Sequence, residues 1–170
     1  MFADRMHTIR NLASLTGVTT AAALGSGLAG GVFFAFSSFV MPALRRLPHG
    51  QGIAAMQSIN RQAPTPVFMT LLFGTAALSA GLGVHSLLHR DEPQAVWLGT
   101  GSLTYLASIA LTASFHVPRN NALAALDAGA TESARYWSTY LSQWTAGNYV
   151  RTITSGASAV LFTVAARRIG

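Results

Sequence analysis

The segment WTAGNYVRT, residues 144–152, places polar side chains where a long apolar stretch begins. Trp144, Asn148 and Arg151 stand at i, i+4 and i+7, so a helix carries all three on one face. An arginine at the centre of a bilayer costs about 2.5–3.5 kcal/mol. A pocket inside a helix bundle lowers this cost and presents the five N–H donors of the guanidinium to an anionic ligand. The alternative is interfacial anchoring, with Arg151 extended toward the membrane surface.

A second polar group, HVPRNN, follows the third apolar stretch of the chain. Pro118 disfavours helical geometry at the residue before it, which predicts that His116, Asn120 and Asn121 lie on a turn at the membrane rim. A histidine there titrates near neutrality and can act as a general base, or it can simply bond a neighbouring carbonyl. In a four-span topology both polar groups lie on the same side of the membrane and can converge.

A third group, HSLLHRDE, carries His85 and His89 at i and i+4 on one helix face. Two such histidines bind a metal when a carboxylate or His7 completes the ligand set. This spacing is weakly specific, and no third ligand stands at a defined position. The sequence therefore predicts no metal site, and this group lies a membrane thickness away from Asn148 and Arg151.

The composition excludes a water-soluble domain. Charged residues make up 9% of the 170 residues, whereas a soluble domain has about 25%. The net charge of +6 comes from eleven arginines, which stand singly or in pairs between apolar runs. Because they form no basic stripe, anionic lipid headgroups are expected partners and nucleic acid is not. The absence of cysteine excludes disulfides and thiolate nucleophiles.

Three intervals without any charged residue exceed the ~20 residues of a membrane-spanning helix. They lie between residues 10 and 45, 61 and 90, and 92 and 119. Prolines that mark helix ends place the first three spans near 14–41, 66–88 and 95–115. Counting ~20 residues back from Arg167 places a fourth span near 146–166. The sequence therefore predicts an all-α, four-transmembrane-helix bundle. It is expected to be one multi-pass domain, residues 1–170, in the cell membrane, with both termini on one face.

The two longer connections are expected to be partly helical. In 42–64, Ile53, Met56 and Ile59 at helical spacing predict a short amphipathic helix at the interface. In 117–145 the sequence predicts a helical turn, a break at Gly129, and a helix that opens at residue 131 or 133. That last helix is expected to run into the fourth span.

Small residues form two rows along the first span, at helical spacing. Such rows let two helix backbones approach closely in lipid. Contacts inside the bundle and a homodimer both explain them. The first row is Gly17, Ala21, Gly25 and Ala29, and the second is Gly27 and Gly31.

Four ordered motifs resemble the anthrone-oxygenase-like family of small four-span membrane proteins. They are GGVFFAFSSFVMPAL, QGIAAMQSINR, HVPRNNAL and WSTYLSQWTAGNYVRT, and the resemblance covers nearly the whole chain. It implies a four-helix membrane bundle that in some members oxidises an anthrone to an anthraquinone with O2, without a recognised metal or organic cofactor. Members commonly carry tryptophan at the position of Gly147 and histidine at that of Tyr149, so this chain departs from them there.

The resemblance, combined with the polar groups, gives one catalytic hypothesis. His116 is the base that takes a proton from the substrate, with Asn120 nearby, and Asn148 and Arg151 stabilise the resulting enolate oxygen as an oxyanion site does. A hydrophobic aromatic molecule and O2 are the substrates. The residues expected to hold the flat substrate are Phe36, Asn121, Trp137, Tyr140 and Trp144.

A second hypothesis belongs to another class. The chain is then a non-enzymatic membrane bundle, acting as an accessory subunit or as a lipid- or quinone-binding protein through the same helix face. An enzyme should lose turnover and keep its fold when its polar groups are replaced, whereas a packing subunit should tolerate the replacement.

Overall fold

The computed structural model describes residues 2–169, with side chains described at residues 10 and 12–169, and every regular element in it is helical. Three of the elements are π-helical segments, written η. In chain order the elements are α1 (Phe2–Ala35), η1 (Phe36–Val40), α2 (Met41–Arg45), α3 (His49–Gln62), α4 (Pro66–Met69), η2 (Thr70–Gly74), α5 (Thr75–Leu88), α6 (Ala95–Leu111), η3 (Thr112–His116), α7 (Val117–Ala124) and α8 (Ser133–Ala166).

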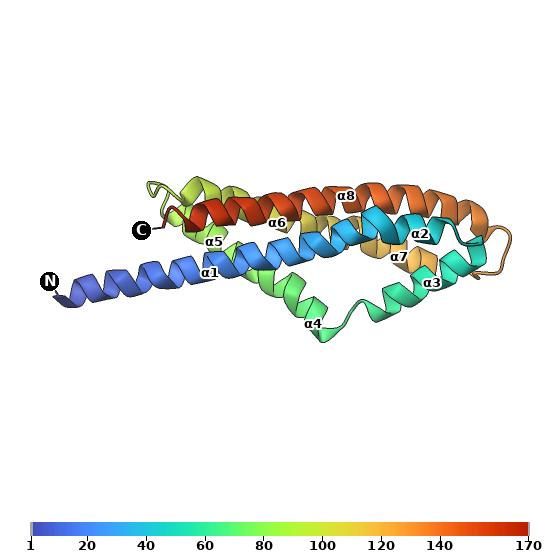
Figure 1. The fold of residues 1–170 in the computed structure, drawn as a ribbon, viewed down its shortest axis with the longest axis horizontal. Coiled ribbons are helices and arrows are strands. Elements are labelled where there is room, and N and C mark those ends of the chain that lie inside the picture. The colour runs from blue at the N-terminus through green and yellow to red at the C-terminus, as the bar shows by residue number, and fades with distance from the viewer. Residues whose placement is uncertain (1, 170) are drawn as a thin grey trace.

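The long helices pack side by side into one bundle (Figure 1). α8 lies along α1 and also contacts α6, while α5 contacts both α6 and α1. Both ends of the chain lie at the same end of the bundle, and the connection between α3 and α4 projects from it on one side (Figure 1). The prediction of an all-α four-helix bundle is confirmed.

Within residues 2–169, three helical stretches are long and apolar enough to cross a membrane. They are Leu12–Arg45, Pro66–Leu88 and Ala95–Ala124. α8 has the same length as α1, 34 residues, but its inner face carries Asn148, Arg151 and several serines, which lower its hydropathy. The three apolar stretches are those of a membrane protein, and the fourth span near 146–166 stays a prediction.

Two predicted helix boundaries are wrong. The first span was expected to end at Pro42, and His116 to Asn121 were expected to lie on a turn beside Pro118. Instead η1 continues into α2 through Pro42, and η3 continues into α7 through Pro118. The third stretch therefore reaches residue 124, and His116 lies on a helix with its side chain turned inward.

The π segments explain how both helices pass a proline. A proline ring in an α-helix meets the carbonyl four residues earlier, here that of Ser38 or Ser114. Both of these residues lie inside a π segment. There the backbone pairs five residues back, as in the bond from the Met41 N–H to the Phe36 carbonyl. This wider turn accommodates the ring without ending the helix.

The predicted elements in the connections are present. The amphipathic helix is α3, which buries Ile53 and Met56 against the bundle. α7 ends at residue 124, and α8 begins at Ser133 and runs without interruption through the fourth predicted span. Pro66 opens α4 where a boundary was expected, and the Thr65 hydroxyl accepts the Phe68 N–H at 3.2 Å.

The small-residue rows divide between two environments. Gly25 and Ala29 are buried inside the bundle, whereas the other members of both rows are exposed. A Cβ added to Gly25 would meet the Thr75 side chain on α5, with 3.2 Å to its Cβ. The buried pair therefore serves packing within the chain, while a homodimer through the exposed Gly27 and Gly31 stays a prediction.

Gly25→Ala is expected to lower the free energy of unfolding by about 1–3 kcal/mol, because the added methyl group overpacks the contact with Thr75. Thermal unfolding in detergent micelles measures this. Gly31→Ala is the matched control, since a Cβ there meets nothing within 4 Å. Equal stability of the two variants would contradict the close contact between α1 and α5.

Candidate functional site

A cavity of about 590 Å³ lies between α1, α3, α4, the π segments, α7 and α8. This volume is within the usual size of a small-molecule site. Most of its lining is apolar, and its aromatic residues are Phe33, Phe36, Phe68, Phe73 and Trp144. Its polar residues are Asn60, Gln62, Thr65, Thr112, His116, Asn120 and Arg151. Phe73 and Val117, which are 60% and 46% exposed, also lie on the outer surface, so the cavity reaches the apolar exterior of the bundle.

Arg151 is buried in the wall of this cavity, at 6% exposure. Its Nε donates to the Asn148 Oδ1 at 3.1 Å, and one terminal nitrogen donates to the same oxygen. The other terminal nitrogen donates to the Thr112 Oγ1 at 3.2 Å. The guanidinium also lies over the Phe33 ring, 4.2 Å from its centroid. The structure therefore favours the internal pocket over interfacial anchoring.

The charge of Arg151 has no anionic partner among the described side chains, because no aspartate or glutamate lies within ion-pair distance of it. A buried charge without a counter-ion is costly. Three of its five N–H groups are used in hydrogen bonds. The other two make no hydrogen bond to any described residue, and since Arg151 lines the cavity, an anion or a partly negative oxygen bound there can accept them.

Asn148 holds Arg151 in place and does not line the cavity. Its Nδ2 donates to the Phe33 carbonyl at 2.6 Å and to the Ser37 hydroxyl at 2.7 Å, and its oxygen accepts from Arg151. All of its hydrogen-bonding groups are thus occupied. The structure thus places Asn148 behind Arg151, and its role as a direct donor to the substrate stays a prediction.

His116 lies in η3 at 1% exposure and faces the same cavity. Its Nδ1 is 3.4 Å from the Leu111 carbonyl oxygen and its Nε2 is 3.4 Å from the Trp144 carbonyl oxygen. A neutral imidazole has a hydrogen on only one nitrogen. One nitrogen therefore faces a carbonyl oxygen without a hydrogen between them, and an additional proton would complete that bond.

Asn120 joins the cavity to the aromatic core behind it. Its Oδ1 accepts from the Tyr140 hydroxyl at 2.8 Å and from the Trp144 Nε1 at 2.9 Å. Burial raises the pKa of the Tyr140 phenol, so this hydroxyl remains a donor. The two bonds fix the amide with its nitrogen directed away from them.

The predicted substrate-binding residues fall into three groups. Phe36 and Trp144 line the cavity, with ring centroids 5.8 Å apart. Trp137 and Tyr140 stack on each other at 5.6 Å in the core next to Trp144, and they do not line the cavity. Asn121 is exposed and lies outside the cavity, because it points away from the bundle on α7.

Several cavity residues were not expected from the sequence. Thr112 precedes His116 by four residues and so shares its helix face, a spacing that could have indicated it. Asn60 stands four residues after Met56 on the inward face of α3. No sequence pattern could have identified Phe33 as a cavity residue, because the residues around it in the sequence are also apolar.

Gly147 and Tyr149, where this chain departs from the pattern that the resemblance implies, do not line the cavity. A Cβ on Gly147 would approach the Phe115 ring to 2.6 Å and the His116 Cε1 to 3.1 Å. A tryptophan there does not fit this arrangement. Tyr149 is 47% exposed, and its hydroxyl is 3.5 Å from the Ser37 carbonyl oxygen.

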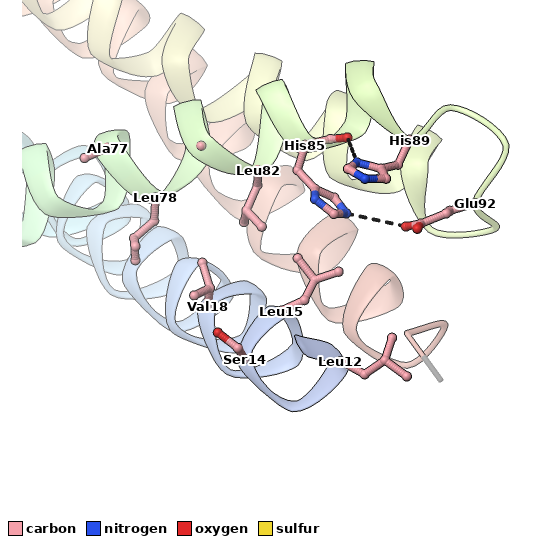
Figure 2. A pocket seen from close by; sticks show the side chains of 11 residues that line it. Leu12, Ser14, Leu15, Val18, Ala77, Leu78, Leu82, His85, His89 and Glu92 are labelled. Carbon is pink, nitrogen blue, oxygen red and sulfur yellow. Dashed lines mark hydrogen bonds and ion pairs between the residues drawn. The ribbon is translucent and has the colours of Figure 1, made fainter. Parts of the chain in front are cut away.

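The histidine pair lies in a second cavity, of about 650 Å³, between α1 and α5 at the end where both termini lie (Figure 2). His85 Nε2 is 3.4 Å from a Glu92 oxygen, and the rings of His85 and His89 stack at 4.2 Å. No three histidine, cysteine or acidic side chains in the described part of the chain come together to hold a metal ion. His7 lies outside the described side chains.

Compared with models of known protein families, residues 54–161 match anthrone oxygenase. The chain belongs to the anthrone oxygenase family. The matched region contains Asn60, His116, Asn120, Asn148 and Arg151, so it holds Asn148 and all the polar residues that line the cavity. No curated protein and no solved structure matches the chain. The candidate site of this member of the anthrone oxygenase family is therefore described from its own cavity residues alone.

Asn148→Ala is expected to lower the free energy of unfolding by about 2–4 kcal/mol, because it removes both hydrogen bonds from the buried Arg151 guanidinium to the Asn148 oxygen and the bond that Asn148 donates to the Phe33 carbonyl. Chemical unfolding in detergent micelles measures this. The exposed Asn121→Ala is the control and should change stability by less than about 0.5 kcal/mol. A small loss in Asn148→Ala would show that the network does not hold Arg151.

Proposed function

We propose that this protein is a membrane-embedded oxygenase that oxidises a lipophilic polycyclic phenol of the anthrone type to a quinone with O2, without a metal or organic cofactor. The observation that carries the proposal is the Arg151 guanidinium, buried in an aromatic cavity with two N–H groups free and no carboxylate partner among the described residues. Membership of the family supports an oxygenase-like role.

The cavity suits a flat apolar molecule with one oxygen directed at Arg151. Phe33, Phe36 and Trp144 provide aromatic surfaces for its rings. Hydrogen bonds from a fixed cation to a developing oxyanion are strong where water is excluded. The guanidinium therefore favours the enolate form of the substrate over the neutral ketone.

The reaction needs only the substrate and O2. Loss of a proton from the methylene carbon gives a delocalised enolate, which passes one electron to O2. The resulting carbon radical and superoxide combine to form a C–O bond, giving a peroxide at that carbon. Loss of the second hydrogen from the carbon and cleavage of the O–O bond release one water and leave the second carbonyl. One O2 is consumed for each quinone and water formed.

In this proposal His116, which lines the cavity, takes the first proton. Its hydrogen-free nitrogen turns from the carbonyl oxygen that it faces in the structure toward the substrate carbon, and the protonated ring can then donate to the Leu111 and Trp144 carbonyls. The negative charge of the enolate then lies between the imidazolium and Arg151. Proton transfer by such a side chain contributes about 10²–10⁴-fold to a rate.

Purified protein in detergent, given an anthrone and ¹⁸O2, is expected to form quinone above the autoxidation rate with one ¹⁸O atom per molecule. Absorbance and mass spectrometry measure the two quantities. Arg151→Gln should lower the rate by about 10²–10³-fold, the usual cost of losing one oxyanion donor. Arg135→Gln makes the same change at an exposed position of α8 and should leave the rate unchanged.

An unchanged rate of quinone formation in Arg151→Gln, or quinone that contains no ¹⁸O, would contradict the oxygenase mechanism. Quinone that binds to the protein while no anthrone is consumed would instead support the non-enzymatic, quinone-binding alternative.

His116→Gln is expected to slow the reaction by about 10²-fold near neutral pH, because the substrate loses its base. At higher pH the substrate ionises without help, so the rate of the variant should rise toward that of the unchanged protein. A pH–rate profile for both proteins measures this. Arg151→Gln, which keeps the base, should show no comparable recovery, and a parallel profile for His116→Gln would exclude His116 as the base.

A further inference from the structure

The second cavity, between α1 and α5, has the opposite electrostatic character to the Arg151 cavity (Figure 2). Glu92 is its only acidic lining residue, and no arginine lines it. The Arg151 cavity contains a cation and no carboxylate among its lining residues. The two cavities therefore favour ligand groups of opposite charge, and the catalytic proposal uses only one of them.

The polar side chains of the second cavity gather at one end. Figure 2 shows His85, His89 and Glu92 together where α5 ends, while Ala77 and Leu78 lie farther along this helix. Ala77 precedes His85 by eight residues, a rise of about 12 Å in a helix. Apolar side chains of α1 form the facing wall, namely Leu12, Leu15 and Val18. The cavity thus has a polar mouth and an apolar floor.

The mouth lies at the edge of the apolar spans. His85 is in the last turn of the stretch Pro66–Leu88, and the wall on α1 begins at Leu12, the first residue of the stretch Leu12–Arg45. The end of a spanning stretch lies near the polar head groups of the bilayer. The cavity therefore runs from the head-group level into the hydrocarbon, as a membrane lipid does.

Glu92 has one carboxylate oxygen left for a ligand. Its Oε2 accepts from the Gln94 Nε2 at 2.6 Å and lies 3.4 Å from the His85 Nε2. Its other oxygen makes no hydrogen bond to any described residue, and the side chain is 40% exposed. Since Glu92 lines the cavity, an ammonium group bound at the mouth can donate to this oxygen.

A guanidinium stands on the α1 side of the mouth. Ser14 and Val18 line the cavity from α1, and Arg10 precedes Ser14 by four residues, so it lies on the same face one turn farther out. The Arg10 side chain is exposed. Arginine binds phosphate oxygens through charge-assisted hydrogen bonds, so a phosphate above the cavity has a partner there.

We propose that this cavity binds a phospholipid of the phosphatidylethanolamine type, whose head group carries a primary ammonium and a phosphate. The ammonium donates to Glu92, the phosphate accepts from Arg10, and one acyl chain fills the apolar floor. Opposite charges on the two sides of the mouth match the opposite charges of this head group. The site is separate from the Arg151 cavity and does not depend on the proposed function.

The chemistry of Glu92 distinguishes this lipid from the other common ones. A primary ammonium has three N–H donors, whereas the quaternary ammonium of phosphatidylcholine has none. The glycerol head group of phosphatidylglycerol carries no cation, and the carboxylate repels its net negative charge. The ethanolamine lipid alone among these three offers Glu92 a charge-assisted hydrogen bond.

Native mass spectrometry of the delipidated protein in detergent measures the binding of dioleoyl lipids with each of the three head groups. The ethanolamine lipid is expected to bind about fivefold more tightly than the choline lipid, the value of one hydrogen bond. Glu92→Gln should remove this preference. Asp91→Asn makes the matched change at the neighbouring exposed carboxylate, which does not line the cavity, and should keep the preference.

Gly81→Leu tests where the acyl chain lies. Gly81 lines the apolar part of the cavity, and a Cβ there meets nothing within 4 Å, so a leucine fills the space without displacing a helix. Binding of the ethanolamine lipid should fall by at least about fivefold. The thermal midpoint of the lipid-free protein should not fall, because leucine favours a helix more than glycine does. Gly31→Leu, at an exposed and equally open position outside the cavity, is the control.

Three results would overturn the proposal. Equal binding of the ethanolamine and choline lipids, or a preference that survives Glu92→Gln, would contradict the assigned head group. Unchanged lipid binding in Gly81→Leu would contradict the cavity as its site. These measurements involve no quinone formation, so their outcome is independent of whether the protein is an oxygenase.

Discussion

The buried guanidinium of Arg151 is the constraint on which the site depends. Burying a cation inside a helix bundle is costly unless hydrogen bonds compensate for the lost hydration. Asn148 and Thr112 accept three such bonds from Arg151. Asn148 in turn donates to the Phe33 carbonyl and the Ser37 hydroxyl on the first long helix. These bonds join α8 to α1 and to η3. The same hydrogen bonds therefore stabilise the bundle and orient the guanidinium.

The three π segments shape the cavity around this cation. η1 provides Phe36, η2 provides Leu72 and Phe73, and η3 provides Thr112 and His116. A side chain also approaches a backbone carbonyl in each segment or within three residues of it. Asn148 donates to Phe33, Tyr105 donates to Leu72, and a ring nitrogen of His116 faces Leu111. Wide helical turns at functional sites are common, and here two of them also accommodate a proline.

The architecture and the polar helix face could be predicted from the sequence because both follow from simple patterns. Charge-free intervals revealed the long helices, and the spacing of Trp144, Asn148 and Arg151 revealed their common face. The helix ends at Pro42 and Pro118 could not be predicted, because a π segment that accommodates a proline has no known sequence signature. The directions in which Asn148 and Asn121 point could not be predicted either, because contacts between distant segments decide them.

The exposed rim of the cavity, formed by Phe73 and Val117, has a kinetic consequence. A lipophilic compound that reaches the site through this rim diffuses in two dimensions within the lipid phase. Its effective concentration is then its mole fraction among the lipids, set by partitioning from water. Diluting the protein and the compound with additional lipid or detergent should therefore slow their encounter even when the aqueous volume is constant.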